Sequence, residues 1–151
     1  MTSISESYEL IKSQIECAAG NSGRDAEAID LIAVSKTWPA ETVSELVECG
    51  HKLFGENKVQ ELEVKAPSLP SSLRWHFIGH LQKNKVRKVL PLVEAIHSVD
   101  SLEIAERINT IASDLGLFPT IYVQVNHARE STKFGFSPEE LTRSFDTLLQ
   151  L

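Results

Sequence analysis

Lys36 lies near the end of the stretch "LIAVSKT" (residues 31–37), in which every other side chain is apolar or small. Moving an ammonium group out of water is costly, so a lysine in such a run needs a reason. One reason is ordinary: a lysine at a strand end can extend its ammonium group into water along its aliphatic stem. The other is chemical, because partial desolvation favours the neutral amine, which attacks an aldehyde or ketone to form a Schiff base. The second interpretation requires a carbonyl ligand.

Further polar residues stand at the ends of other strand-like segments. Such segments read "LIAVSKT", "HKLFGE", "LRWHFIG", "EAIHSV" and "TIYVQVN", and the polar or small residues at or just after their ends are Lys36, Glu56, Asn57, Gly79, His80, Ser98, Asp100 and Asn126. Ligand sites of parallel α/β folds lie at the carboxyl ends of strands, so these residues are site candidates. Helix capping is the alternative role for Asn57, followed by Gln60, and for Asp100 or Ser101, followed by Glu103.

The elements that would position these residues alternate regularly. Strand candidates begin near residues 31, 52, 73, 94 and 119, a repeat of about 20 to 25 residues that suits one βα unit. A helix is expected before them over about 4–18, and a last helix is expected to begin at Ser137, with Pro138 in the first position and Glu140 closing a capping box. The pattern fits either a five-stranded doubly wound sheet or part of an eight-stranded β/α barrel. Length favours the first, since a full barrel commonly needs about 250 residues.

Composition narrows the class of partner. The chain has 151 residues and a formal net charge of −6, which argues against nucleic acid or an anionic membrane surface as the main partner. Apolar runs fall short of the roughly 18 residues of a membrane span, and the start "MTSISESYEL" lacks the order of a signal peptide, so we expect a cytoplasmic location. Cys17 and Cys49 fit no metal-binding spacing.

Two other clusters are weaker site candidates. His76 and His80 have the spacing that chelates zinc on a helix, but they stand in a strand-like segment, where four residues span about 13 Å. We therefore expect no metal site there. The basic residues Lys83, Lys85, Arg87 and Lys88 alternate with apolar residues, as the solvated face of a helix does. A glycine-rich phosphate loop after the first strand is absent, because "SKTWPAET" contains no glycine.

Five motifs in one order carry a family resemblance. They are "AVSKTWP", "LFGENKVQE", "WHFIGHLQKNK", "IHSVDS" and the pattern of Gln124 to Gly135. Together they resemble the pyridoxal phosphate homeostasis proteins, the YggS/PROSC-type family, from about residue 4 to the end. The resemblance implies a β/α barrel like the N-terminal domain of alanine racemase, with pyridoxal 5′-phosphate (PLP) held as a Schiff base on Lys36. It also implies that Asn57 lines the cofactor pocket and that Lys133 is a second lysine near the pocket mouth.

The same resemblance implies a role in intracellular PLP (vitamin B6) homeostasis. Family members are regarded as handling and buffering the cofactor, with PLP-accepting apo-enzymes as partners and without an established catalytic turnover. Two enzyme alternatives remain: a PLP-dependent amino-acid racemase, which needs a second acid/base group, and a barrel of the class I aldolase type that uses Lys36 without a cofactor.

The chain departs from the family in length. It ends after the fifth βα unit, whereas relatives continue for about three more. We therefore expect residues 1–151 to form a partial (β/α)8 barrel, preceded by one helix and truncated after its fifth unit, without the later loops that bind phosphate in barrels. Open sheet edges invite pairing with another chain, so self-association is also expected.

Overall fold

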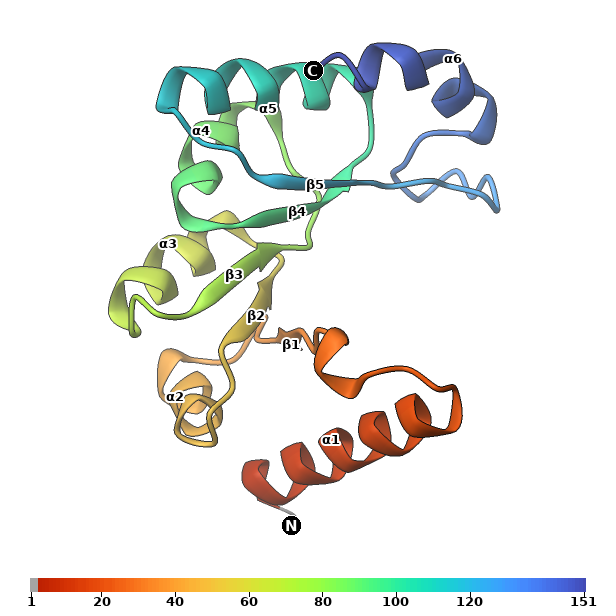
Figure 1. The fold of residues 1–151 in the computed structure, drawn as a ribbon. Coiled ribbons are helices and arrows are strands. Elements are labelled where there is room, and N and C mark those ends of the chain that lie inside the picture. The colour runs from red at the N-terminus through yellow and green to blue at the C-terminus, as the bar shows by residue number, and fades with distance from the viewer. Residues whose placement is uncertain (1–2) are drawn as a thin grey trace.

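The structure, a computed structural model, describes residues 3–151 as alternating helices and strands (Figure 1). The strands are β1 (Ala33–Val34), β2 (Leu53–Glu56), β3 (Arg74–Phe77), β4 (Ala95–Val99) and β5 (Thr120–Val123). The α-helices are α1 (Ile4–Asn21), α2 (Ala40–Glu48), α3 (Val59–Ser68), α4 (Val86–Val89), α5 (Leu102–Leu115) and α6 (Pro138–Leu148). Short 3-10 turns cover Ala26–Ala28, Lys83–Lys85 and Leu90–Leu92. All five predicted strands and the two predicted terminal helices are present, with shorter strands than the apolar runs suggested.

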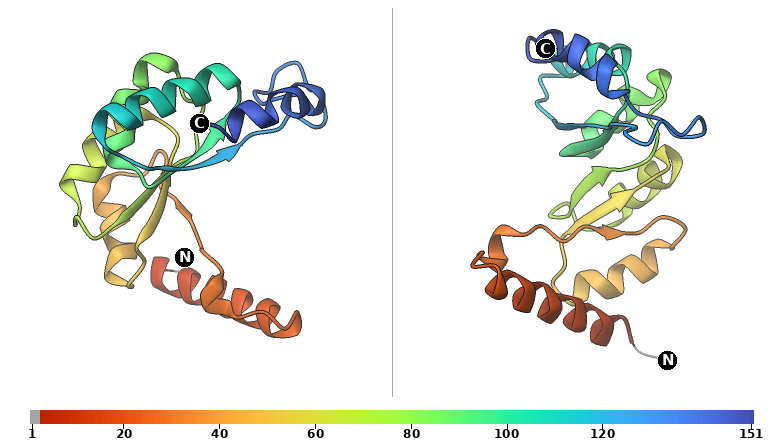
Figure 2. Two further views of the ribbon diagram at one scale, coloured as in Figure 1. Left: turned by 45° about the horizontal axis from the view of Figure 1, so that its top comes forward. Right: turned by 90° about the vertical axis from the view of Figure 1, so that its right-hand side faces the viewer.

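Strand order distinguishes the two candidate architectures. The strands pair in the sequential order β1-β2-β3-β4-β5, and each pair is parallel. A doubly wound sheet reverses its strand order at a switch point, whereas a barrel adds each strand beside the last. The sheet is curled, with α2 to α5 along its convex face (Figure 2). The fold is therefore part of a β/α barrel preceded by one helix, and the doubly wound sheet that the length favoured is wrong.

The hydrophobic core lies between the sheet and these outer helices. Alternate strand residues point into it, as Phe54, Phe77 and Ile96 do with at most 1% exposure. Helices supply the other half of the core, through Leu62, Val86, Val89, Ile108 and Ile111. The period of two in the strands and of three to four in the helices produces this layer.

Local capping signals explain most helix ends. Ser137 and Glu140 form the predicted capping box of α6. Ser101 caps α5 by accepting from the backbone N–H of Ile104. The predicted cap at Asn57 is wrong, because Lys58 is the N-cap residue of α3 and makes no capping bond with its side chain.

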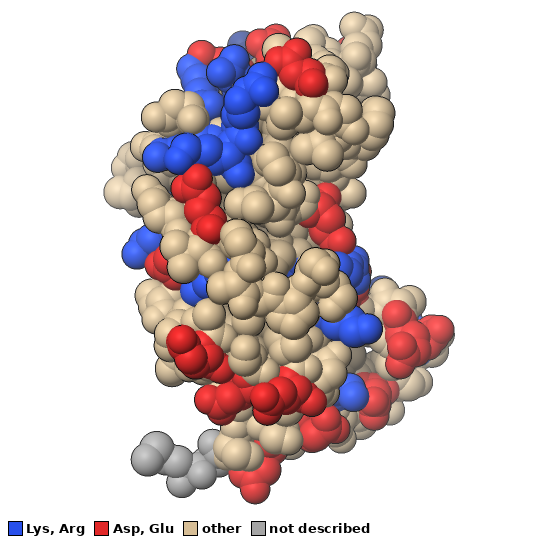
Figure 3. All heavy atoms as spheres, turned by 90° about the vertical axis from the view of Figure 1, so that its left-hand side faces the viewer, with Lys and Arg blue, Asp and Glu red and all other residues tan. Residues whose placement is uncertain are grey.

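The predicted basic face is confirmed as an outer surface. Val86 and Val89 are buried, while Arg87 pairs with Asp114 at 2.8 Å and Lys88 with Glu63 at 3.0 Å. Figure 3 shows basic side chains gathered at one end of this face, with acidic side chains beside them. In the described part of the chain, no helix has the length and apolar character needed to cross a membrane.

Candidate functional site

The predicted site residues follow successive strands at one end of the sheet, where the carboxyl ends of the strands lie. Lys36 comes two residues after β1, Asn57 directly after β2, His80 after β3 and Asp100 directly after β4. Because all strands are parallel, their carboxyl ends lie at the same end of the sheet, and the candidate residues therefore share this end, as the βα repeat predicted.

Lys36 is exposed, in contrast to the desolvated lysine that its apolar neighbours suggested. β1 has only two residues at the edge of the sheet, and Val34 is 47% exposed. Lys36 sits in a turn that is closed by a hydrogen bond from the N–H of Trp38 to the carbonyl of Ser35, 3.1 Å long. The ammonium group thus reaches water, as the ordinary interpretation expects.

A buried ion-pair network lies directly behind this turn. The ammonium of Lys65 is 2.5 Å from Oε1 of Glu56 and 3.2 Å from Oε2 of Glu61. Thr37 donates its backbone N–H to Glu61 at 2.9 Å, and this bond is the main cause that lowers the pKa of Glu61. Sequence analysis singled out neither Lys65 nor Glu61. The available signal was the three-residue spacing of Val59, Leu62 and Lys65, which places the lysine on the buried face of α3.

Asn57 is held by close contact with the next strand end. An ideal Cβ built on Gly79 would lie 2.0 Å from the carbonyl oxygen of Asn57, so only glycine allows this approach. Ile78 also donates its backbone N–H to Glu56 at 2.9 Å. Asn57 lines a pocket of about 160 Å³ together with Lys58, Val59, Gln60, Phe77, His80, Gln82 and Lys85. Lys36 is not among the residues that line this pocket.

His80, which follows β3, contacts residues that follow β4 and β5. Its Nδ1 donates to Oδ2 of Asp100 at 2.9 Å, and its ring stacks on Phe134 with centroids 3.7 Å apart. The Asp100 side chain is only 8% exposed. His80 and His76 therefore have separate partners.

Lys133 lies in a loop that folds over the same edge from the end of β5. Asn126 organises the loop: its amide donates to the carbonyls of Glu130 and Lys133, and its carbonyl accepts from the N–H of Glu130. Gly135 has φ +128°, and a Cβ there would lie 2.7 Å from the backbone nitrogen of Asn126. Lys133 is exposed and lines an open pocket of about 450 Å³ that does not include Lys36.

A histidine pair occupies the middle of the concave face and was not predicted as a unit. Nε2 of His97 lies 2.9 Å from Nδ1 of His76, and Nε2 of His76 lies 2.8 Å from Glu94. Nε of Arg74 donates to Oε1 of Glu94 at 2.9 Å, and this hydrogen bond is the main cause that lowers the pKa of Glu94. Burial, and then the charge of His76, lowers the pKa of His97, whose ring stacks on Tyr122.

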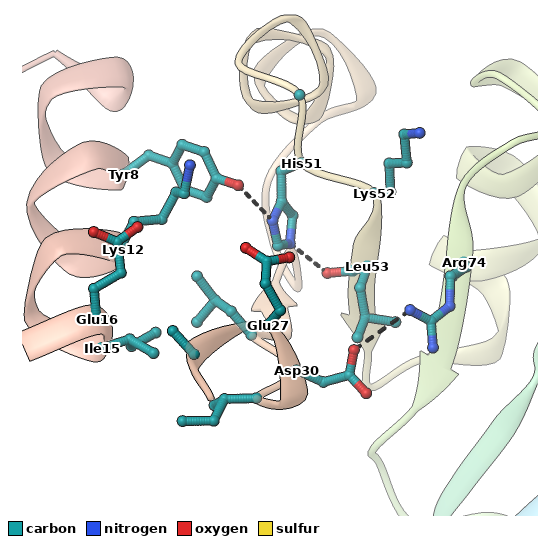
Figure 4. A pocket seen from close by; sticks show the side chains of 14 residues that line it. Tyr8, Lys12, Ile15, Glu16, Glu27, Asp30, His51, Lys52, Leu53 and Arg74 are labelled. Atoms are coloured by element: carbon teal, nitrogen blue, oxygen red, sulfur yellow. Dashed lines mark hydrogen bonds and ion pairs between the residues drawn. The ribbon is translucent and has the colours of Figure 1, made fainter. Parts of the chain in front are cut away.

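A pocket of about 410 Å³ lies at the opposite, amino end of the strands, between α1 and the sheet (Figure 4). Its polar groups bind one another: Tyr8 contacts Nδ1 of His51 at 3.3 Å, and Nε2 of His51 donates to the carbonyl of Leu53 at 2.6 Å. Burial lowers the pKa of His51. These contacts attach α1 to the sheet, which is a structural role.

A partial β/α barrel with a lysine at the carboxyl end of its first strand is therefore the class that the fold and the site define. Comparison with known proteins names the family. The chain is 39% identical over its whole length to the pyridoxal phosphate homeostasis protein of Pseudomonas aeruginosa and 37% identical over 97% of its length to that of Aquifex aeolicus. The chain is a homologue of the pyridoxal phosphate homeostasis proteins, which confirms the resemblance seen in its motifs.

Solved structures agree with this relationship. PipY of Synechococcus elongatus PCC7942 covers 91% of the chain at 39% identity without PLP (TM-score 0.79), and at 37% identity with PLP bound (TM-score 0.75). Alanine racemase of Clostridium difficile 630, with a TM-score of 0.65 over 94% of the chain at 21% identity, shares the fold. No family model matches the chain. The chain spans 66% and 64% of the length of the Pseudomonas and Aquifex relatives, and 65% and 64% of the two PipY structures.

Proposed function

We propose that the chain binds pyridoxal 5′-phosphate through a Schiff base on Lys36 and serves intracellular PLP (vitamin B6) homeostasis in the cytoplasm. The observation that carries the proposal is the position of Lys36: an exposed primary amine on a fixed turn at the carboxyl edge of a barrel sheet. PLP supplies an aldehyde that condenses with such an amine with loss of water. The structure of PipY with PLP bound, and the names of the curated relatives, support this ligand.

Lys36, and two further residues at the same end of the sheet, have side chains that suit an aldehyde ligand with a phosphate. Within residues 3–151 Lys36 takes part in no ion pair, so its amine is available. At the same edge Asn57 offers an amide that can donate or accept, and Lys133 offers a second cation. In this proposal Asn57 lines the ligand pocket, and Lys133 assists exchange at its mouth.

The proposal is one of binding and release, with PLP-accepting apo-enzymes as the recipients and no catalytic turnover. The likeness to alanine racemase concerns the fold alone and adds no activity to it.

A comparison of two ligands tests whether the aldehyde matters. Pyridoxamine 5′-phosphate has the same ring and phosphate as PLP but an amine in place of the aldehyde. We expect equilibrium dialysis to show retention of PLP and at least tenfold weaker retention of pyridoxamine 5′-phosphate, about 1.4 kcal/mol. Equal retention of both would mean that no Schiff base forms.

The chain as it stands is also proposed to self-associate. β1 and β5 each pair with a single neighbour, so the sheet of the described chain has two outer edges. Unpaired strand edges are templates for other chains. Sedimentation should therefore show a mass that rises with protein concentration, whereas a monomer at all concentrations would contradict this proposal.

A further inference from the structure

The turn that carries Lys36 is strained. Thr37 has φ +69°, in the left-handed region that β-branched residues rarely adopt. Such a conformation costs free energy and persists only where surrounding contacts determine it. The residues that contact this turn must therefore hold Thr37 in its strained conformation.

These contacts lie on both sides of Lys36 and end in one network. On one side, the carbonyl of Ser35 accepts from the ammonium of Lys65 at 2.8 Å, and its hydroxyl donates to Glu56 at 2.7 Å. On the other side, the N–H of Thr37 donates to Glu61 at 2.9 Å. The backbone is thus fixed immediately before and immediately after Lys36, while the Lys36 side chain stays exposed.

The centre of this network, the pair of Lys65 and Glu56, is buried, whereas Glu61 is partly exposed. The ammonium of Lys65, on a residue 5% exposed, has three N–H groups and three oxygen partners, on Ser35, Glu56 and Glu61. Glu56, at the end of β2, is completely buried. Replacing a buried ion pair with apolar residues is often neutral or stabilising, so overall stability is a weak reason for placing one here. Its specific effect is to tie α3 and β2 to the turn after β1.

We propose that Lys65, Glu56 and Glu61 are positioning residues that hold residues 35–37 in the strained turn and so fix the direction in which Lys36 meets an aldehyde. This inference rests on the proposed function, because the aldehyde is the proposed ligand. None of the three touches the ligand in this account. They act through the backbone on either side of Lys36.

Glu61 gives the sharpest test, because it is partly exposed and its removal leaves the Lys65–Glu56 pair intact. Glu61→Ala removes the acceptor for Thr37, whereas Glu61→Gln keeps a carbonyl oxygen in its place. Glu63→Ala is the matched control, since Glu63 lies on the same helix and pairs with Lys88 on the outer surface. Hydrogen exchange of the Thr37 backbone amide, measured without any ligand, shows whether its hydrogen bond to Glu61 is present. The exchange rate should rise about tenfold in Glu61→Ala and stay near the wild-type rate in the other two variants.

Labelling by PLP followed by borohydride reduction measures how readily Lys36 reacts with the aldehyde, and so tests whether the turn positions Lys36. The reduced adduct on Lys36 should form several-fold more slowly in Glu61→Ala and near the wild-type rate in Glu61→Gln. Lys52, exposed at the other end of the sheet, is the internal reference and should be labelled equally in all variants. If Glu61→Ala damaged the fold as a whole, the labelling of Lys52 would change as well, and Glu61→Gln would not restore the labelling of Lys36.

The outcomes separate the two claims. Unchanged Thr37 exchange in Glu61→Ala, or unchanged Lys36 labelling despite faster exchange, overturns the positioning role. Wild-type labelling that does not prefer Lys36 over Lys52 overturns the proposed function, whatever the exchange of Thr37 shows.

Discussion

The ammonium of Lys65 and the carboxylate of Glu56 form a buried pair 2.5 Å apart, with side chains 6% and 0% exposed. The pair connects the middle of α3 to the end of β2, and through Ser35 it reaches the turn of Lys36. Two side chains from other elements thus shape the backbone around Lys36.

Lys65→Met should destabilise the chain strongly. It leaves the Glu56 carboxylate buried without its cation, a loss of about 3–5 kcal/mol in the free energy of unfolding. The double variant Lys65→Met/Glu56→Gln should lose less than the single variant, because no uncompensated charge remains. Urea denaturation measures both, and a single variant as stable as wild type would show that the pair is not buried in solution.

Gly79→Ala should displace the backbone that carries Asn57. The added Cβ would lie 2.0 Å from the Asn57 carbonyl oxygen, and such overpacking typically costs about 1–3 kcal/mol. Gly20→Ala is the matched control: a Cβ added there would have no atom within 4 Å, and alanine within a helix is favoured by about 0.5–1 kcal/mol. Equal stability of the two variants in urea would refute the close approach.

The histidine pair predicts a pH dependence of stability. Burial and the neighbouring His76 lower the pKa of His97 below its usual 6.5. Between that lowered value and 6.5 the unfolded chain binds more protons than the folded chain, so the free energy of unfolding falls as the pH falls through this window. Above 6.5 the contribution of His97 is complete.

His97→Gln should therefore lose less stability than wild type between about pH 7.5 and pH 5. His127→Gln, at an exposed histidine, should keep the wild-type slope. The slopes of the free energy of unfolding against pH are compared, and not its absolute values, because His97→Gln also loses the contact of His97 with His76. A slope for His97→Gln as steep as that of wild type would show that His97 does not contribute.

Local signals predicted the elements, whereas the barrel arrangement was predicted from the family resemblance, and the structure confirms it. Ser137 with Glu140, and the apolar runs of β2 to β5, carry their structure in a few neighbouring residues. A curled sheet and a doubly wound sheet use the same βα unit, so only the pairing of strands separates them.

In the candidate site, too, some features follow from local sequence and others depend on contacts between distant residues. The parallel strands brought the strand-end residues to one edge, as predicted, because that follows from the βα repeat alone. The exposure of Lys36 depends on β1 being a two-residue edge strand, and the burial of Lys65 depends on Glu56 lying opposite it on another element. The spacing of Val59, Leu62 and Lys65 places Lys65 on the buried face of α3, but charged residues are normally expected to be exposed, and the acidic partner lies on another element.

Lys133→Ala should leave the adduct on Lys36 able to form but weaken PLP retention or slow exchange by up to about tenfold. Lys133 is an exposed cation in the loop that follows β5, where it can attract the phosphate of the ligand. Lys88→Ala removes a cation from the outer surface and is the control. Dialysis and transfer to an acceptor amine measure the effect. A complete loss of the adduct would give Lys133 a larger role than the one proposed.

A Schiff base on Lys36 is tested most directly by identifying the lysine that PLP modifies. The chain is incubated with PLP, reduced with borohydride, digested and analysed by mass spectrometry, alongside Lys36→Ala and the control Lys52→Ala. We expect one preferred adduct, on Lys36, that is absent in Lys36→Ala and retained in Lys52→Ala. A full-stoichiometry adduct on another lysine, or the same total adduct in Lys36→Ala as in wild type, would contradict this expectation.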